Sequence, residues 1–323
     1  MADCDLLIIG AGISGLSMAH YATNAGLKTR VLEGEQRAGG CLHSHCFGGA
    51  LDDFWLELGA HSSFNSYGNL LVILERIQLL DRLQRRAKVG LRLFAEGAIR
   101  SIPSQLYFSE LLLAPFRLIG VKKTGRSVAD YFGPIVGRRN YAAVFEPAFS
   151  AVICQPADNF PADVLFRSRL RRKDIPRGFT LPGGLQTIAD NLSQQPGIMV
   201  ELGQTAREIW RTGKHFTVYT DGSEYTARAL CLATPVAVVA ELLQAEFPNL
   251  ADLLARIQTA MTETVGVAVH AEALRLPPLA GLIGRNEVFY SAVSRDIVPD
   301  PAYRGFTFHF RPGVLDEAGK WAR

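Results

Sequence analysis

The sequence predicts an α/β protein of two domains. One domain is a doubly wound, three-layer α/β fold around a parallel sheet, and the other combines a mixed sheet with helices. Three observations carry this prediction. A glycine-rich turn follows an apolar strand near the start of the chain, strand and helix patterns alternate after it, and 323 residues suffice for two cores.

The first strand and its turn are the strongest of these signals. Residues 6–9 form a continuous apolar run, which is typical of a strand buried on both faces of a parallel sheet. The run leads into residues 10–15, GAGISG, which have the GxGxxG pattern. A segment with helical periodicity follows and ends at Gly26, where a helix terminus favours positive φ. Residues 29–32 predict the second strand.

Each residue type in this unit has a physical role. Gly10 permits the tight turn, Gly12 lets a pyrophosphate approach the backbone, and Gly15 lets helix and strand pack closely. Free N–H groups at the helix start hold anionic phosphates, and an acid at the end of the next strand accepts hydrogen bonds from a ribose diol. A structural βαβ turn without ligand remains the alternative. The predicted contacts are Gly10, Gly12, Ile13, Ser14, Gly15 and Glu33.

Composition limits the class of protein. Hydrophobic residues make up 48% and charged residues 20%, as in a globular protein, and a net charge of +3 gives no reason to expect nucleic acid as a partner. Five scattered cysteines fit a reducing compartment. We find no signal peptide and no uninterrupted apolar run long enough to span a membrane, so we expect a cytoplasmic protein or one at the cytoplasmic face of a membrane.

A second motif follows the second strand. Glu33, Arg37, Gly39 and Gly40 form the pattern Glu-x-x-x-Arg-x-Gly-Gly. This pattern after a GxGxxG unit resembles the FAD-dependent amine oxidase superfamily, which includes protoporphyrinogen oxidases, carotenoid desaturases and, more distantly, UDP-galactopyranose mutases. The resemblance implies a GR2-type FAD-binding domain with FAD as the cofactor. It also implies that Glu33 holds the adenosine ribose and that the other three residues lie along the pyrophosphate.

The resemblance extends to later segments. Residues 43–58 predict a hairpin around a Gly-Gly pair, and the stretch after it is similar to the family's Glu-x-Gly segment, whose backbone passes against the isoalloxazine ring. Residues 181–186 and 231–235 resemble two further family segments. The additional cofactor contacts that the resemblance implies are Cys41, Leu58, Gly59, Ala60, His61, Ala206 and Ala233.

The histidines near these motifs allow three interpretations. Cys41, His43 and His45 alternate and could share one face of a strand, as zinc ligands do, but no second Cys/His cluster completes a site, so we expect no metal. The second interpretation is a plain strand edge beside the cofactor. In the third, His43 contacts substrate, because several protoporphyrinogen oxidases carry an arginine there. Catalysis is centred on the flavin, with His43 and His61 as candidates near substrate or ring.

Residues 105–121 are unusually apolar. Glu110, Pro115 and Arg117 exclude a spanning helix, and Lys122 and Lys123 follow directly. An apolar segment with a basic flank suits interfacial insertion, and protoporphyrinogen oxidases are often anchored through this region. The alternative is a helical pair that caps a hydrophobic substrate cavity. A basic run at 167–177 is either a solvated face or an anchor for an acidic substrate or anionic lipid.

The remaining patterns predict an ordinary alternation of elements. Ser127, with Asp130 three residues later, predicts a capped helix start. The other predicted elements are a helix at 70–86, a hairpin at 90–101, a strand at 198–202, a hairpin at 216–232 with an Asp-Gly turn, a helix from 237, and strands at 263–270, 288–293 and 304–310. The predicted FAD-binding domain is 1–75 with 185–240, and the predicted substrate domain is 76–184 with 241–323.

The resemblance implies a dehydrogenase that transfers hydride from an apolar or tetrapyrrole-like substrate to flavin N5. Protoporphyrinogen oxidase, in porphyrin and heme biosynthesis, is the leading hypothesis. The alternatives are an amine oxidase or carotenoid desaturase, a mutase-like flavoenzyme, and a non-catalytic flavin-binding remnant. Family members continue beyond the equivalent of Arg323 with a strand and a helix that faces the flavin, so we expect residues 1–323 alone to hold FAD weakly.

Overall fold

The computed structural model describes residues 2–49 and 51–321, which form two compact units. The first unit comprises Met1–Phe47, Gly59–Gln84 and Arg177–Thr259, and the second comprises Gly48–Leu58, Arg85–Pro176 and Ala260–Arg323. Both are discontinuous in sequence, and their bounds differ from those of the predicted domains at every break. Residues 48–58 lie in the second unit, and the helix α10 (Pro248–Ala255) lies in the first.

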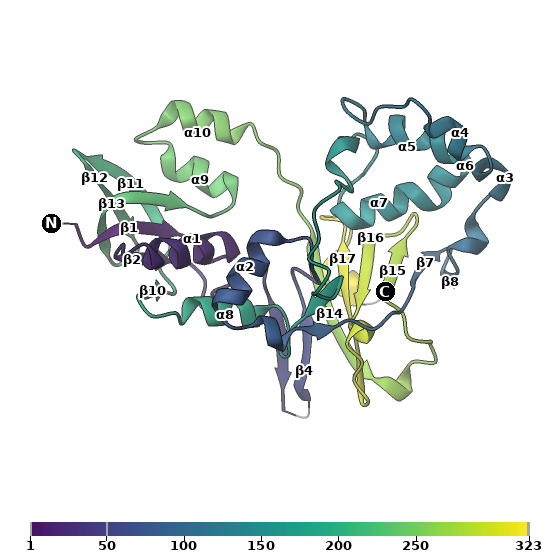
Figure 1. Cartoon of the computed structure of the whole chain (residues 1–323), viewed down its shortest axis with the longest axis horizontal. Coiled ribbons are helices and arrows are strands. Elements are labelled where there is room, and N and C mark those ends of the chain that lie inside the picture. The colour runs from purple at the N-terminus through teal and green to yellow at the C-terminus, as the bar shows by residue number, and fades with distance from the viewer. Residues whose placement is uncertain (1, 50, 322–323) are drawn as a thin grey trace. The chain divides into compact units, whose positions relative to one another are not determined.

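The first unit is built on a six-stranded sheet of order β10-β2-β1-β13-β12-β11 (Figure 1). The strands β10, β2, β1 and β13 run parallel, and β13, β12 and β11 form an antiparallel meander. The predicted strand at 198–202 and hairpin at 216–232 are therefore confirmed, whereas β11 was not predicted. The bounds are β1 (Cys4–Ile9), β2 (Thr29–Leu32), β10 (Ile198–Glu201), β11 (Ala206–Thr212), β12 (His215–Thr220) and β13 (Glu224–Leu232).

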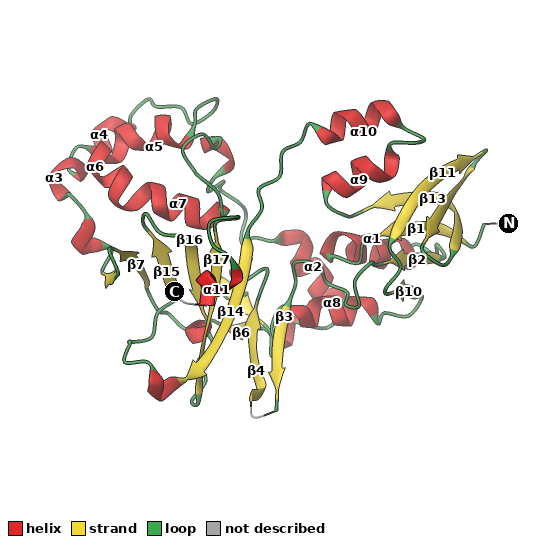
Figure 2. Ribbon diagram, turned by 180° about the vertical axis from the view of Figure 1, so that it is seen from behind, coloured by secondary structure: helices red, strands yellow, loops and turns green. Residues whose placement is uncertain are grey.

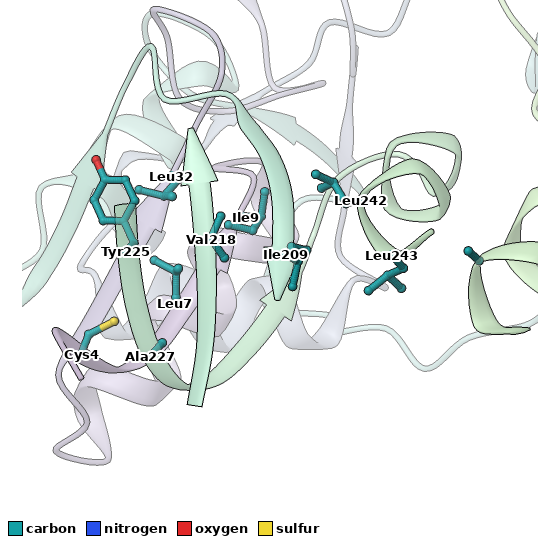
Figure 3. Packing of buried hydrophobic residues seen from close by; sticks show 11 residues of the cluster. Cys4, Leu7, Ile9, Leu32, Ile209, Val218, Tyr225, Ala227, Leu242 and Leu243 are labelled. Carbon is teal, nitrogen blue, oxygen red and sulfur yellow. The ribbon is translucent and has the colours of Figure 1, made fainter. Parts of the chain in front are cut away.

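Helices cover both faces of this sheet, which gives the predicted three layers. On one face, Leu7 and Ile9 of β1 pack with Val218 of β12 and with Leu242 of α9 (Val236–Leu243), as Figure 3 shows. On the other face lies α1 (Ile13–Asn24), which closes at Gly26 with φ +83°, as predicted. The remaining elements of this unit are α2 (Gly68–Arg76), a 3-10 turn (Leu80–Arg82), α8 (Gln186–Ser193) and the short strands β5 (Ser63–Phe64) and β9 (Gly178–Thr180).

One predicted helix is much shorter than expected. The periodic segment at 70–86 predicted a single helix, but α2 ends at Arg76. Gln78 adopts a left-handed conformation with φ +58°, which cannot continue an α-helix. The segment beyond it contains only the 3-10 turn and the two-residue strand β6 (Gln84–Arg85). The helical prediction for residues 77–86 is therefore wrong.

The second unit contains a mixed six-stranded sheet of order β14-β17-β16-β15-β7-β8. It includes the predicted hairpin at 90–101 and the three strands predicted between 263 and 310, which are confirmed. The strand β15, which pairs in parallel with β7, was not predicted. The bounds are β7 (Leu91–Ala95), β8 (Ala98–Arg100), β14 (Glu263–His270), β15 (Gly281–Gly284), β16 (Phe289–Ser294) and β17 (Tyr303–Phe310).

Helices lie on one face of this second sheet (Figure 2). Ala148 and Ala151 of α7 pack against Leu93 and Ile283 of the sheet. The N-cap prediction is confirmed, because the Asp130 backbone N–H donates to the Ser127 hydroxyl at 3.1 Å. The helical bounds are α3 (Phe108–Leu111), α4 (Ala114–Leu118), α5 (Val128–Val136), α6 (Arg138–Asn140), a π-helical turn (Tyr141–Phe145), α7 (Glu146–Ile153) and α11 (Glu317–Trp321).

Two further sequence predictions concern residues 43–58 and 105–121. The hairpin predicted within 43–58 is present as the two-stranded sheet of β3 (Ser44–Gly48) and β4 (Leu51–Glu57). The apolar segment 105–121 is divided into the short helices α3 and α4. Within residues 2–49 and 51–321, no helix has the length and apolar character needed to cross a membrane.

Candidate functional site

The turn between β1 and α1 has the properties of an anion site. The helix N-cap is Gly12, with φ −68° and ψ 175°, and no side chain caps the helix. The first turn of the helix also carries no acidic residue. Since the first N–H groups of a helix lack intrahelical partners and lie at its positive end, this turn is suited to phosphate oxygens.

The three glycines of the turn are required for different physical reasons. A Cβ on Gly15 would lie 1.9 Å from the Gly10 carbonyl oxygen, so this residue lets helix and strand pack. Gly10 itself has φ +101°, and a Cβ there would lie 2.8 Å from the carbonyl oxygen of Ala233. Around Gly12, by contrast, no described atom lies within 4 Å of a Cβ position. The space beside Gly12 is therefore open to a ligand.

A cavity borders the same helix start. Its volume is about 510 Å³, and it lies between α1 and α2. Its lining residues are Ile13, Ser14, Ser17, Tyr21, Asn69, Leu70 and Ile73. Ile13 and Ser14, both predicted cofactor contacts, are thus next to space that the protein does not fill.

Glu33 is held at the ends of the first two strands. One carboxylate oxygen accepts a hydrogen bond from the Ala11 backbone N–H at 2.7 Å, and the other accepts one from the Glu35 N–H at 3.1 Å. The carboxylate is therefore fixed beside the glycine turn, and its remaining lone pairs can accept hydrogen bonds from a diol. The segment before Ala206 lies alongside, because a Cβ on Gly34 would be 3.0 Å from the Thr205 hydroxyl.

The second glycine pair is brought against the first turn. Gly39 and Gly40 have φ of +118° and +54°. Gly39 forms a bridge with Gly12, its N–H donates to the Ala11 carbonyl at 2.8 Å, and a Cβ on Gly40 would lie 3.2 Å from the Gly12 Cα. The two motifs, which are separated by more than twenty residues, therefore form one continuous backbone surface.

The Arg37 side chain forms hydrogen bonds with the loop that carries the second glycine pair. Its guanidinium donates to the carbonyl oxygens of Ala38 at 3.1 Å, Leu42 at 2.9 Å and Gly40 at 2.9 Å. It also donates to the side-chain oxygen of Gln186, the first residue of α8, at 2.8 Å. The side chain therefore fixes the shape of the loop around the glycine pair.

Cys41, Gly59 and Ala60 lie together at the end of this loop. The Ala60 N–H donates to the Cys41 carbonyl at 2.7 Å, and a Cβ on Gly59 would lie 2.2 Å from the same oxygen. The close approach that requires glycine at position 59 is thus to the backbone of Cys41. The predicted approach of Gly59 to the flavin ring stays a prediction.

The side chains of His43 and His45 lie near each other without a hydrogen bond between them among the contacts described. The ring centroids of His43 and His45 are 6.4 Å apart, edge to face. Burial, with smaller contributions from the charges of Arg37 and His45, lowers the pKa of His43 below its ordinary value. His61 is partly buried. In the described part of the chain, no three His, Cys, Asp or Glu side chains are grouped as metal ligands would be.

Two predicted contacts are not part of the glycine surface. Ala206 begins β11, which is an edge strand of the first sheet. Leu58 belongs to the second unit, where it packs beside Gly266 of β14. The other predicted cofactor residues all lie in the first unit.

Sequence reasoning missed two residues beside the site. Gln186 binds Arg37, and Thr234 packs against Gly10, where its buried hydroxyl has no hydrogen-bond partner among the described residues. Each lies within a segment that resembles the family, 181–186 for Gln186 and 231–235 for Thr234, and this resemblance is the signal that could have identified them. A buried polar atom without a partner is a feature that a bound ligand or water satisfies. The residues present therefore fit a dinucleotide: an uncapped helix start, open space at Gly12 and an oriented carboxylate.

Comparison with known proteins agrees with this geometry. The chain matches 15-cis-phytoene desaturase of Solanum lycopersicum with 34% identity over 111 residues, which is 34% of this chain and only 18% of that protein. Among solved structures, a protein assigned as a protoporphyrinogen oxidase from Exiguobacterium sp. 255-15 superimposes with a TM-score of 0.78 at 18% identity. That superposition covers 100% of this chain and 81% of the other.

A reduced UDP-galactopyranose mutase superimposes with a TM-score of 0.71 at 15% identity, over 98% of this chain and 76% of that one. Identities this low show the fold alone. The model of the family described as flavin-containing amine oxidoreductases matches residues 13–270, which is most of the chain. This protein therefore belongs to the flavin-containing amine oxidoreductase family, whose members are FAD-dependent oxidoreductases.

Proposed function

We propose that the chain is an FAD-dependent oxidoreductase that dehydrogenates an apolar or tetrapyrrole-like substrate. The observation that carries this proposal is the continuous glycine surface formed by Gly12, Gly39 and Gly40, with open space at Gly12. When bound, FAD supplies at its N5 the acceptor for a hydride that leaves a substrate carbon, and O₂ or another acceptor then takes up the electrons.

The protein's own part in this chemistry is to hold and orient. The N–H groups of Ile13 and Ser14, at the positive end of α1, bind the pyrophosphate. Glu33 accepts hydrogen bonds from the adenosine ribose, and its own contacts with Ala11 and Glu35 keep it oriented. The first unit is in this proposal the FAD-binding domain, and the second supplies the substrate-binding surface.

Further roles from the resemblance belong to the same proposal. Cys41, Gly59 and Ala60 continue the surface towards the flavin ring. Ala206 flanks the adenine, and Ala233, which lies against Gly10, is close to the cofactor. His43, whose lowered pKa favours its neutral form near pH 7, faces substrate. No metal takes part in this proposal.

Protoporphyrinogen oxidase is the specific activity that we propose. It is supported by the fold shared with the assigned protoporphyrinogen oxidase and by the apolar helices of the second unit. The desaturase match supports carotenoid desaturation as the alternative, and amine oxidation, mutase-like chemistry and a non-catalytic flavin protein remain as further alternatives.

Anaerobic mixing separates these activities. We expect protoporphyrinogen IX to bleach the absorbance of the oxidised flavin in the FAD-loaded protein. The flavin receives hydride and stays reduced, because no oxidant is present. Phytoene and a primary amine serve as parallel substrates. If only phytoene or only the amine bleaches the flavin, that compound's class replaces tetrapyrroles as the substrate. If none of the three bleaches it, protoporphyrinogen oxidation is contradicted, and the mutase-like and non-catalytic alternatives are favoured.

We also propose contact with an anionic membrane surface through α3, α4 and the segment after them. Leu112, Phe116 and Ile119 are 74%, 73% and 76% exposed, which is unusual for large apolar side chains. Lys122, which follows in sequence, is exposed, whereas the partly buried Lys123 donates through its ammonium group to the Leu165 carbonyl. Apolar side chains beside basic ones are typical of segments that insert at an interface without spanning it.

The start of this segment is fixed by hydrogen bonds and an ion pair to α6. Asn140, which is fully buried, accepts from the Tyr107 N–H at 2.8 Å and donates to the Tyr107 carbonyl at 3.0 Å. Glu110 accepts from the Arg139 side chain at 2.7 Å. These polar contacts fix the start of α3, from which the exposed apolar segment continues.

Liposome co-sedimentation tests this contact. We expect the protein to bind anionic vesicles more than neutral ones, since each lysine near such a surface contributes about 1 kcal/mol. The double change Leu112→Ser and Phe116→Ser should weaken partitioning more than tenfold, because two buried side chains contribute about 3 kcal/mol or more. The matched control, Leu250→Ser with Leu253→Ser, alters exposed leucines of the other unit. Equal binding by all three proteins would favour the cavity-cap alternative for this segment.

A further inference from the structure

Gln186 connects α8 to the loop that carries the second glycine pair. Its side-chain oxygen accepts from Arg37 at 2.8 Å, and its amide nitrogen donates to the Ala38 carbonyl and to the Asp190 carboxylate, both at 2.8 Å. Its backbone N–H donates to the Ser44 hydroxyl at 3.0 Å. One residue thus fixes both ends of the loop to a helix that lies 149 positions later in the sequence.

This connection lies directly behind the glycine surface. A Cβ on Gly39 would be 3.0 Å from a terminal nitrogen of Arg37 and 3.0 Å from the amide nitrogen of Gln186. Gly39 in turn is bridged to Gly12. Gly39 therefore connects the Arg37–Gln186 contact to the backbone of Gly12, where we propose that the ligand binds.

The acceptors of Arg37 are all neutral. They are three backbone carbonyls and the amide oxygen of Gln186, and among the described residues no ion pair includes Arg37. Its guanidinium is thus anchored without being neutralised, and its charge contributes to lowering the pKa of His43. A carboxylate in the place of the amide would cancel this charge locally.

We propose that Gln186 is a positioning residue for the FAD pyrophosphate. Its neutral amide holds Arg37 against the glycine pair and leaves the positive charge of the guanidinium to act on the phosphates. This inference rests on the proposed function. It explains why an amide, which can accept from Arg37 and donate to Ala38 and Asp190 at once, suits this position. A glutamate would lose both donated bonds and face Asp190 with a like charge.

The test is FAD binding to the apo chain, followed by flavin fluorescence at low and high salt. We expect Gln186→Glu to weaken binding about fivefold or more at low salt and to reduce the salt dependence, because the charge that attracts the phosphates is neutralised. Gln186→Met should also weaken binding but keep the wild-type salt dependence, since Arg37 stays charged. ADP carries the pyrophosphate without the flavin. In competition with FAD, its affinities for the wild type and the two variants should follow the same order as those of FAD.

Thermal unfolding of the apo proteins provides the structural control, and Arg37→Lys provides a second variant. Arg37→Lys keeps the charge and loses the forked hydrogen bonds, so it should bind weakly with wild-type salt dependence. If Gln186→Glu and Gln186→Met show the same affinity and the same salt dependence as each other, the charge-preserving role is refuted. Failure of the wild-type protein to bind FAD would instead refute the proposed function together with the inference that rests on it.

Discussion

We expect the change Gly12→Val to weaken FAD binding more than a hundredfold while the protein keeps its fold. The reason is the open space around this residue: no described atom lies within 4 Å of a Cβ there, and its φ of −68° is allowed for any residue. The Cβ of a valine therefore has room, and its two methyl groups extend into the proposed path of the pyrophosphate. Losing two phosphate contacts to helix N–H groups weakens binding by about 3 kcal/mol, or more than a hundredfold.

Flavin fluorescence titration with the wild-type and Gly12→Val chains measures this effect, and thermal unfolding of both apo proteins checks the fold. Gly90→Val is the matched control, because Gly90 is exposed, also has open space at its Cβ position and lies in the second unit. It should bind FAD as the wild type does. Unchanged affinity in Gly12→Val, with both proteins folded, would mean that the pyrophosphate does not pass over this turn.

The features that sequence predicts well are those set by neighbouring residues. The strand–turn–helix unit at the N-terminus, the Ser127 cap and the Asp-Gly hairpin each depend on a few consecutive side chains and backbone angles. Local steric and hydrogen-bonding rules are sufficient to predict them, because no distant partner is needed to define the conformation.

Contacts between distant segments could not be predicted in the same way. Gln186 reaches Arg37 across 149 residues, and nothing in the local pattern of either residue names the other. The close contact between Gly59 and the Cys41 carbonyl was likewise not predicted, since the two residues are eighteen positions apart. The helix expected at 70–86 stops early because Gln78 turns to positive φ, although the apolar periodicity continues past it.

FAD is bound at least about a hundredfold more tightly than FMN in this account, because three of the proposed contacts belong to parts of the cofactor that FMN lacks. Glu33 is fixed by two backbone N–H groups and accepts from the adenosine ribose. Gly39 and Gly40 lie along the pyrophosphate in this proposal, and FMN has only one of its two phosphates. The loop alongside Gly34 leads into Ala206 on the adenine side.

We expect the change Glu33→Gln to reduce the ratio of FAD affinity to FMN affinity but to keep FAD the more tightly bound flavin. The amide of the variant keeps one oxygen acceptor for a ribose hydroxyl and places a donor where the carboxylate now accepts from Ala11 or Glu35. FMN binding, which does not use this residue, serves as the internal control and should be unchanged in the variant.

The most direct test of the central claim is an equilibrium titration of the wild-type chain with FAD and, in parallel, with FMN. The account predicts saturable binding of one FAD per chain and much weaker binding of FMN. Equal affinities for the two flavins, or no saturable binding of FAD, would contradict the assignment of the glycine surface and Glu33 as an FAD site.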